Sequence, residues 1–319
     1  MVDLGIVGVG SMGSKHARIA NSLKDCRLAV ISDLDKEKGA EIAKKEGAEF
    51  SIDYKEMFDK VDCAVIAVPT KFHAQVACDF IGAGIPVLIE KPIANTLQDA
   101  EKIVEMANVS KLPVMVGQIE RFNPLVKELK NIIGNEEIIQ IEARRYGPPL
   151  DRDTGIDVVL DLMIHDIDIV RFLTGSEPSD ILSIGGKTDH YENYAMAMLN
   201  MGGTLCALSS NLITQSKLRT IDITTESKFV RGDYIEQNAE IYRKSLPSFV
   251  LEEGEMKYKQ QYILEKVDVY KQEPLRLELQ HFVECVRSNK TPFVTVHDGL
   301  ANLKIALEIV NKMKRFRVV

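Results

Sequence analysis

A glycine pattern near the N-terminus has the spacing of a dinucleotide-binding loop. Gly8, Gly10 and Gly13 form G-x-G-x-x-G between the apolar run Leu4 to Val7 and a helical stretch. The first glycine permits a tight turn, the second lets the backbone approach a pyrophosphate, and the third lets helix and strand pack closely. The helix N-terminus adds free N–H groups and a positive dipole end. The pattern predicts that residues 8–13, including Ser11 and Met12, hold the phosphates.

Asp33 stands twenty residues beyond Gly13, at the end of the second expected strand. An acid in this position accepts hydrogen bonds from a ribose diol and repels a 2′-phosphate. The sequence therefore favours NAD over NADP, although Lys36 and Lys38 lie close by in the chain. The structural alternative is a tight turn followed by an N-cap acid.

Two further strand ends carry polar groups. Val68-Pro69-Thr70 follows the strand Ala64 to Ala67, and His73 comes at the start of the next helix. Ligands bind beyond the carboxyl ends of strands in open α/β sheets, so these residues and Glu90 are predicted to line the cofactor site. The alternative for His73 is an ordinary residue in the first turn of a helix.

Lys91 follows the buried strand Val87 to Ile89 within Glu90-Lys91-Pro92. Proline restricts the residue before it to extended or turn conformations, which fixes the direction of the lysine. A fixed ammonium there can stabilise a developing alkoxide. The alternative is a surface lysine beside a turn.

A mostly apolar helical stretch, Leu160 to Leu173, carries a narrow polar stripe of Asp161, His165 and Asp168. A helix that is apolar nearly all round is buried, so the stripe must be paired or face a cavity. Asp161 and His165 are four residues apart, so the carboxylate can orient the imidazole and raise its basicity. The pair is interpreted as a general base with its orienting acid. The alternatives are a hydrogen-bonded Asp–His pair in the core and a metal site.

These residues require elements that bring strand ends together. The first 118 residues alternate short apolar runs with amphipathic stretches, which predicts βαβ units and a doubly wound parallel sheet. After residue 118, strand-like runs separated by glycine turns predict an α+β domain with a largely antiparallel open sheet. The fold class is thus α/β, with a Rossmann dinucleotide-binding domain at residues 1–118 and a second domain at residues 119–319.

Composition excludes several classes of protein. The chain has 319 residues, 45% hydrophobic and 27% charged, with 40 basic and 47 acidic residues. A net charge of −7 argues against nucleic acid or an anionic membrane as a partner. Five cysteines without CxxC spacing favour neither a disulfide framework nor a thiolate metal site. The N-terminus has no signal-peptide pattern, and we expect a cytoplasmic protein.

The sequence resembles the Gfo/Idh/MocA (glucose-fructose oxidoreductase and inositol dehydrogenase) family along essentially its full length. The motifs that carry the resemblance are the glycine loop with His16-Ala17, the segments 69–74, 84–92 and 117–124, and the Asp161 to His165 spacing. The resemblance implies an NAD(P)-dependent oxidoreductase acting on a sugar or polyol, with Lys91, Asp161 and His165 as the catalytic set. It also implies a C-terminal sheet that forms homodimers or homotetramers.

Within the family, the segments 120–124, 144–148 and 160–168 look most like nucleotide-sugar 3-dehydrogenases, in particular those acting on UDP-N-acetylglucosamine. Arg145 shares a strand face with Ile141 and Ala143 and is expected to reach inward toward the site. Arg152 or Arg121 would then meet a diphosphate as a planar fork. Asn123 and Tyr146 are the other expected substrate residues. Two alternatives stay open: an inositol or free-aldose dehydrogenase, and a non-catalytic NAD-binding sensor.

Overall fold

The computed structural model describes residues 1–149, 157–188, 191–244, 248–252, 255–259 and 262–317. The chain folds into two compact units, each assembled from separate segments. Unit 1 contains Met1–Phe122 and Gln272–Ile305; unit 2 contains Asn123–Lys271 and Ala306–Val319. The prediction divided the chain once, at residue 118, and assigned everything after it to the second domain.

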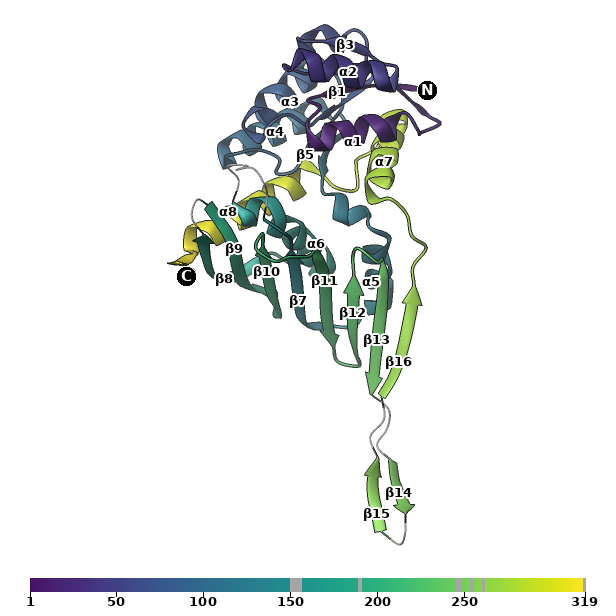
Figure 1. The fold of residues 1–319 in the computed structure, drawn as a ribbon, viewed down its shortest axis with the longest axis vertical. Helices are drawn as coiled ribbons and strands as arrows, with labels where there is room; N and C mark the ends of the chain where they lie inside the picture. Colours follow the sequence, from purple (N-terminus) through teal and green to yellow (C-terminus); the bar gives the residue numbers. More distant parts are fainter. Residues whose placement is uncertain (150–156, 189–190, 245–247, 253–254, 260–261, 318–319) are drawn as a thin grey trace. The chain divides into compact units, whose positions relative to one another are not determined.

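Unit 1 is built on a parallel six-stranded sheet in the order β3-β2-β1-β4-β5-β6 (Figure 1). Its strands are β1 (Val2–Val7), β2 (Cys26–Ser32), β3 (Glu49–Ser51), β4 (Cys63–Ile66), β5 (Val87–Glu90) and β6 (Val114–Gly117). The central strands β4 and β5 are buried along their whole length, as their continuous apolar runs predict. This order confirms the doubly wound sheet, whose order reverses between β1 and β4.

Helices connect and cover these strands. They are α1 (Ser11–Ala20), α2 (Lys36–Glu46), α3 (His73–Gly82) and α4 (Leu97–Ser110), with the short helices η1 (Tyr54–Met57), η2 (Thr70–Phe72) and η3 (Ile119–Phe122). A fifth long helix, α7 (Pro274–Ser288), comes from the far end of the sequence and packs against α1. Its residues Leu275, Leu279, Phe282 and Val283 belong to the same core cluster as β1 and α1. The core of unit 1 therefore needs a segment from near the C-terminus.

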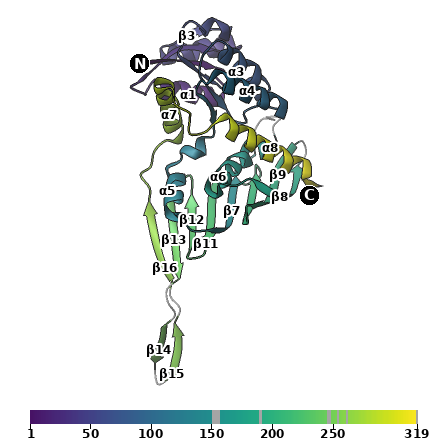
Figure 2. The same ribbon diagram turned by 180° about the vertical axis from the view of Figure 1, so that it is seen from behind.

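Unit 2 contains a nine-stranded sheet in the order β16-β13-β12-β11-β7-β10-β9-β8-β17 (Figures 1 and 2). All neighbouring strands are antiparallel except the pairs β7–β10 and β8–β17. The strands are β7 (Ile138–Tyr146), β8 (Pro178–Thr188), β9 (Tyr191–Met201), β10 (Thr204–Asn211), β11 (Leu218–Thr225), β12 (Lys228–Asp233), β13 (Asn238–Lys244), β16 (Tyr262–Asp268) and β17 (Lys314–Arg317). The largely antiparallel second domain is confirmed.

Some elements of unit 2 differ from the prediction. The expected strand-like runs of the second domain end at Arg231, so strands β13, β16 and β17, together with the separate pair β14 (Ser248–Glu252) and β15 (Glu255–Lys259), were not predicted. Helix α6 (Ile164–Thr174) is preceded by a π-helical turn, η4 (Val159–Met163), where one continuous α-helix was expected.

Three helices complete the described structure (Figure 2). Helix α6 packs against strands β7, β9 and β10, and α5 (Pro124–Ile133) lies beside β12 and β13. The third helix, α8 (Val296–Lys312), contains the point at which the chain passes from unit 1 to unit 2. Among the described residues, no helix is both long and apolar enough to cross a membrane.

Candidate active site

The glycine loop of unit 1 is sterically restricted at two of its three glycines. Gly8 has a φ of +88°, and a Cβ there would stand 2.8 Å from the carbonyl of Ala67. At Gly13, a Cβ would stand 1.8 Å from the carbonyl oxygen of Gly8. Side chains are excluded at both positions by the protein's own backbone, as expected for a tight strand-to-helix turn.

Gly10 is different, because a Cβ there would meet no atom of the chain within 4 Å. It is the N-cap of α1, where N–H groups point out of the helix. Steric demand inside the protein therefore does not explain a glycine at this position. Close approach of an external group, such as a pyrophosphate, does explain it. Ser11 is exposed and Met12 half-buried beside it.

Asp33 is tied directly to this loop. Its carboxylate accepts hydrogen bonds from the backbone N–H of Val9, at 2.6 Å, and of Asp35, at 2.8 Å. The acid is therefore held at the edge of the phosphate loop, where the ribose diol of a dinucleotide would lie and where a 2′-phosphate would meet a like charge. The residues present fit NAD.

The next strand end gives its predicted residues different environments. Pro69 is exposed, whereas Val68 and Thr70, the first residue of η2, are half-buried. His73 is only 1% exposed and its ring nitrogens contact the carbonyl oxygens of Val68 and Pro92, each at 2.9 Å. Burial lowers the pKa of His73, although the two carbonyl contacts oppose this change. His73 thus joins two loops of the site, and its contact with the cofactor remains a prediction.

The Glu90-Lys91-Pro92 turn follows β5, and the Lys91–Pro92 peptide bond is cis. Glu90 is buried, and one carboxylate oxygen contacts Nε2 of His16 at 2.7 Å. Its other oxygen accepts a hydrogen bond from the backbone N–H of Lys91 at 3.3 Å. Glu90 is therefore an internal support of the backbone at Lys91, a role that the sequence did not indicate. Lys91 itself is partly exposed.

In unit 2, the second pair of predicted catalytic residues lies where a π-helical turn meets an α-helix. Asp161 belongs to η4 and is partly exposed; His165 is 9% exposed in the first turn of α6. π-Helical turns inserted in α-helices are frequent at functional sites. Because η4 changes the number of residues per turn, the predicted four-residue spacing no longer fixes how the two side chains face each other.

His165 is followed by a buried ion pair. Asp166 accepts hydrogen bonds from Nε and Nη2 of Arg145, the shortest being 2.8 Å, and both side chains are 1% exposed. The guanidinium also lies 5.3 Å from the centre of the Tyr234 ring. Arg145 points inward from β7, as predicted, and its described contacts tie α6 to the sheet. Its contact with the substrate remains a prediction.

The other expected substrate residues have separate surroundings. Arg121, in unit 1, is buried 3.9 Å from Asp298 and over the ring of Phe293. Asn123 caps α5 by accepting from Leu125 N–H and donates to the Tyr234 carbonyl. The hydroxyl of Tyr146 donates to Ser209 at 3.0 Å. Arg152 lies outside the described residues.

Comparisons with known proteins agree with these features. A model of the GFO/IDH/MocA oxidoreductase family, described as having an NAD-binding Rossmann fold, matches residues 2–118, and the GFO/IDH/MocA C-terminal domain matches residues 130–230. A UDP-N-acetylglucosamine 3-dehydrogenase of Acidithiobacillus ferrooxidans is 28% identical across 94% of this chain and 93% of that protein. A solved structure of such an enzyme from that organism has a TM-score of 0.89 and 26% identity, covering 98% of this chain and 97% of its own.

A scyllo-inositol 2-dehydrogenase (NAD(+)) of Bacillus subtilis is also similar, with 25% identity across 98% of this chain and 94% of the relative. The two relatives act on different substrates by name, yet both extend over nearly the whole chain. The glycine loop, the acid at the end of β2 and both domain matches lead to one conclusion: the chain belongs to the GFO/IDH/MocA family of NAD-binding oxidoreductases.

Proposed function

We propose that this protein is an NAD-dependent dehydrogenase that oxidises a secondary hydroxyl of a nucleotide sugar to a ketone, with C3 of UDP-N-acetylglucosamine as the first candidate. The observation that carries the substrate class is the similarity to the UDP-N-acetylglucosamine 3-dehydrogenase of Acidithiobacillus ferrooxidans along nearly the full length of both chains. The activity is of the CH–OH dehydrogenase type.

The proposed roles follow from the chemistry of three residues. NAD, when bound, supplies the hydride acceptor. The imidazole of His165 accepts the hydroxyl proton, and the carboxylate of Asp161 orients the ring. The ammonium of Lys91 stabilises negative charge on the same oxygen. Lys91 is alternatively the immediate proton acceptor, since a lysine beside a reacting hydroxyl can itself act as the general base.

The two glycines with opposite surroundings offer a test of the cofactor site. Gly10→Ala adds a methyl group where the chain leaves space, so its thermal unfolding should match that of the wild type while its NAD affinity falls. Gly13→Ala drives a methyl group into the Gly8 carbonyl and should lower stability as well. Calorimetric titration with NAD and thermal unfolding separate the two effects. Wild-type NAD affinity in Gly10→Ala would place the phosphates elsewhere.

A substrate panel tests the proposed reaction. NADH formation should be followed with UDP-N-acetylglucosamine, other UDP-sugars, free sugars and inositols, with NADP in parallel. We expect oxidation of a UDP-sugar with NAD. The position of the ketone in the product should then be determined. Reaction with free polyols only would contradict the nucleotide-sugar assignment.

An inositol dehydrogenase is the second candidate, supported by the similarity to the scyllo-inositol enzyme. It predicts turnover without any nucleotide group. It also predicts that Arg152→Ala leaves KM unchanged. A nucleotide-sugar enzyme that uses Arg152 for its diphosphate would instead show a raised KM in this variant.

We also propose a homodimer or homotetramer formed through the sheet of unit 2, in the cytoplasm. Exposed apolar side chains share one face of neighbouring strands: Leu182 and Ile184 on β8 are paired with Met198 and Met196 on β9. Contiguous exposed apolar patches are typical of protein interfaces. All five cysteines are free and buried, which fits a reducing compartment. Light scattering at several concentrations, with Met198→Lys as the disrupting variant, tests the assembly.

A further inference from the structure

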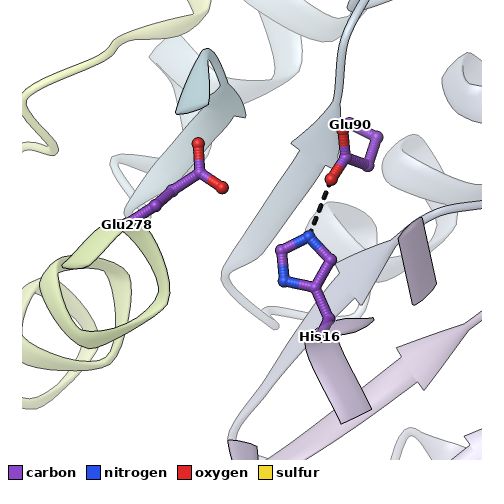
Figure 3. Close-up of side chains that lie close together, drawn as sticks. All are labelled: His16, Glu90 and Glu278. Atoms are coloured by element: carbon purple, nitrogen blue, oxygen red, sulfur yellow. Dashed lines mark hydrogen bonds and ion pairs between the residues drawn. The ribbon is translucent and has the colours of Figure 1, made fainter. Parts of the chain in front are cut away.

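Three ionisable side chains from distant parts of the sequence meet in the core of unit 1. His16 comes from α1, Glu90 from the end of β5, and Glu278 from α7 (Figure 3). His16 and Glu278 are 0% exposed and Glu90 is 6% exposed. One nitrogen or oxygen of each lies within 4.8 Å of the others. The proposed reaction uses none of the three directly, so the cluster needs its own explanation.

The partners of Glu90 account for its charge. Oε1 is 2.7 Å from Nε2 of His16, and Oε2 accepts from the backbone N–H of Lys91. Glu278 has a different environment. Within the part of the chain that the structure describes, neither of its oxygens has a hydrogen-bond partner. The same holds for Nδ1 of His16. A second carboxylate is thus buried beside a pair in which the imidazole of His16 is already engaged by Glu90.

The charged groups on the surrounding elements are directed elsewhere. On η3, which packs against α7, Arg121 lies over Phe293 and near Asp298, and Glu120 is buried. Four polar residues of α7 and its N-cap have partners outside the cluster: Glu273 with Arg18, Arg276 with Ser22, His281 with the N–H of Phe293, and Arg287 with Asp25. Lys91, on the chain after β5, is an exception: its backbone N–H donates to Glu90, and its charge, like that of the buried His73, lowers the pKa of Glu90.

A metal ion shared by the three residues does not fit the distance between His16 and Glu90. Two ligands of a tetrahedral ion, each bonded at about 2.1 Å, are roughly 3.4 Å apart. The 2.7 Å separation of Nε2 and Oε1 is instead that of a charge-assisted hydrogen bond. A proton is the remaining way to remove the second charge.

Burial of an ionised carboxylate without a partner is so unfavourable that the group takes up a proton instead. Burial and the neighbouring charge of Glu90 raise the pKa of Glu278 well above its ordinary value. Burial acts the same way on Glu90, but the hydrogen bond and charge of His16, together with the charges of Lys91 and His73, outweigh it and lower the pKa of Glu90. The two acids are therefore driven in opposite directions.

We propose that Glu278 is a neutral carboxylic acid in the folded protein and acts as a positioning residue for Lys91. Because Glu278 is neutral, Glu90 is the one charged carboxylate of the cluster, and it pairs with His16 and holds the backbone of Lys91. This inference rests on the proposed function only for the role of Lys91. Loss of the Glu278 proton at high pH would place two like charges together and disturb the support of Lys91.

Protonation of Glu278 has a defined effect on stability. A group with a raised folded pKa stabilises the fold fully below its unfolded pKa, and this contribution declines as pH rises toward the folded pKa. Glutamine keeps the shape of the neutral acid and does not titrate. The stability of Glu278→Gln relative to the wild type should therefore increase from pH 5 to pH 8, by up to about tenfold in the unfolding equilibrium constant per pH unit.

The matched control is Glu284→Gln, the same substitution at an exposed position of α7. Urea unfolding of the wild type and both variants at several pH values should show the pH-dependent difference in Glu278→Gln alone. An infrared difference spectrum between wild type and Glu278→Gln at pH 7 should contain the carbonyl band of a protonated acid. Carboxylate bands, or a stability difference that is constant with pH, would overturn the proposal.

Two more measurements decide what the cluster does. Metal analysis of the purified protein should find no stoichiometric ion; an ion that is present in the wild type and lost in Glu278→Gln would replace the proton as the explanation. The kcat of Glu278→Gln should decline at a higher pH than that of the wild type. An unchanged kcat profile would overturn the positioning role, whereas full activity in Lys91→Ala would reject the proposed mechanism and leave the protonation result intact.

Discussion

Each unit places a predicted catalytic residue next to a buried carboxylate, but the two carboxylates are neutralised differently. In unit 1, Glu90 precedes Lys91 and contacts His16, and a second acid lies nearby, Glu278, whose pKa is raised well above its ordinary value by burial. In unit 2, Asp166 follows His165 and is paired with Arg145, which is charged at every accessible pH. The support of His165 should therefore be insensitive to pH, and that of Lys91 sensitive to it.

The largest expected effects are on turnover. Lys91→Ala and His165→Ala should each lower kcat by about 10²–10⁴-fold, because each removes a group that moves a proton or stabilises charge. If both act on one hydroxyl, the double variant should lose less than the product of the single losses. Steady-state kinetics of the four proteins measure this coupling. Unchanged turnover in Lys91→Ala would contradict both roles proposed for this residue.

The pH–rate profiles of these variants assign the base. Removal of the immediate proton acceptor should abolish the acidic limb of kcat, since that limb reports the protonation of the base. Removal of the other residue should lower kcat at all pH values and leave the limb in place. His165→Ala should show the first behaviour, and Lys91→Ala the second.

The next effect tests the permanent ion pair of unit 2. Arg145→Met removes the guanidinium that is paired with the buried Asp166 carboxylate, which should cost about 3–5 kcal/mol of unfolding free energy. Arg144→Met is the matched control from the same strand. Its partner Asp222 keeps a second arginine, Arg231, so we expect a loss of about 1 kcal/mol or less.

Urea unfolding at neutral pH checks both values. Addition of Asp166→Asn to Arg145→Met should recover part of the stability, because it removes a buried negative charge that has lost the guanidinium of Arg145. A loss in Arg145→Met no larger than that of the control would show that this pair is not the anchor of α6.

The smallest expected effect is on the stability of unit 2 at low pH. Glu136 contacts Lys228 at 2.7 Å, and hydrogen bonds from Lys228, Thr225 and Ser227 lower its pKa to about 2. A depressed folded pKa gives stability that is present above the unfolded pKa and lost as pH falls through the folded value. The wild type should therefore lose its advantage over Glu136→Gln between about pH 4.5 and pH 2. Acid unfolding of both proteins measures it, and parallel curves would contradict the prediction.

The sequence predicted those parts of the site that depend on local chain geometry. Gly8 to Gly13, with a strand before and a helix after, form the expected loop, and Asp33 lies beside it. The apolar runs of β4 and β5 identify buried strands because a parallel sheet is covered on both faces. These features are encoded within a few residues of one another.

Contacts between distant segments could not be read in the same way. The apolar positions of α7 predict a buried face but not that this face completes the core around β1, more than 200 residues away in the sequence. Arg145 and Asp166 are 21 residues apart, and their pairing depends on how α6 lies on the sheet. The π-helical turn at Asp161 has no periodic signal, since it departs from the period used to recognise a helix.

The discontinuity of unit 1 has a consequence for how the protein is made. A ribosome synthesises β1 to β6 long before it reaches α7. Part of the apolar core surface of the nascent sheet therefore stays uncovered until Leu275, Leu279, Phe282 and Val283 have been synthesised. A fragment that ends at residue 118 would contain every strand of this sheet and still expose that apolar surface. We expect it to aggregate, and to become soluble when a peptide covering Gln272–Ile305 is supplied during its synthesis.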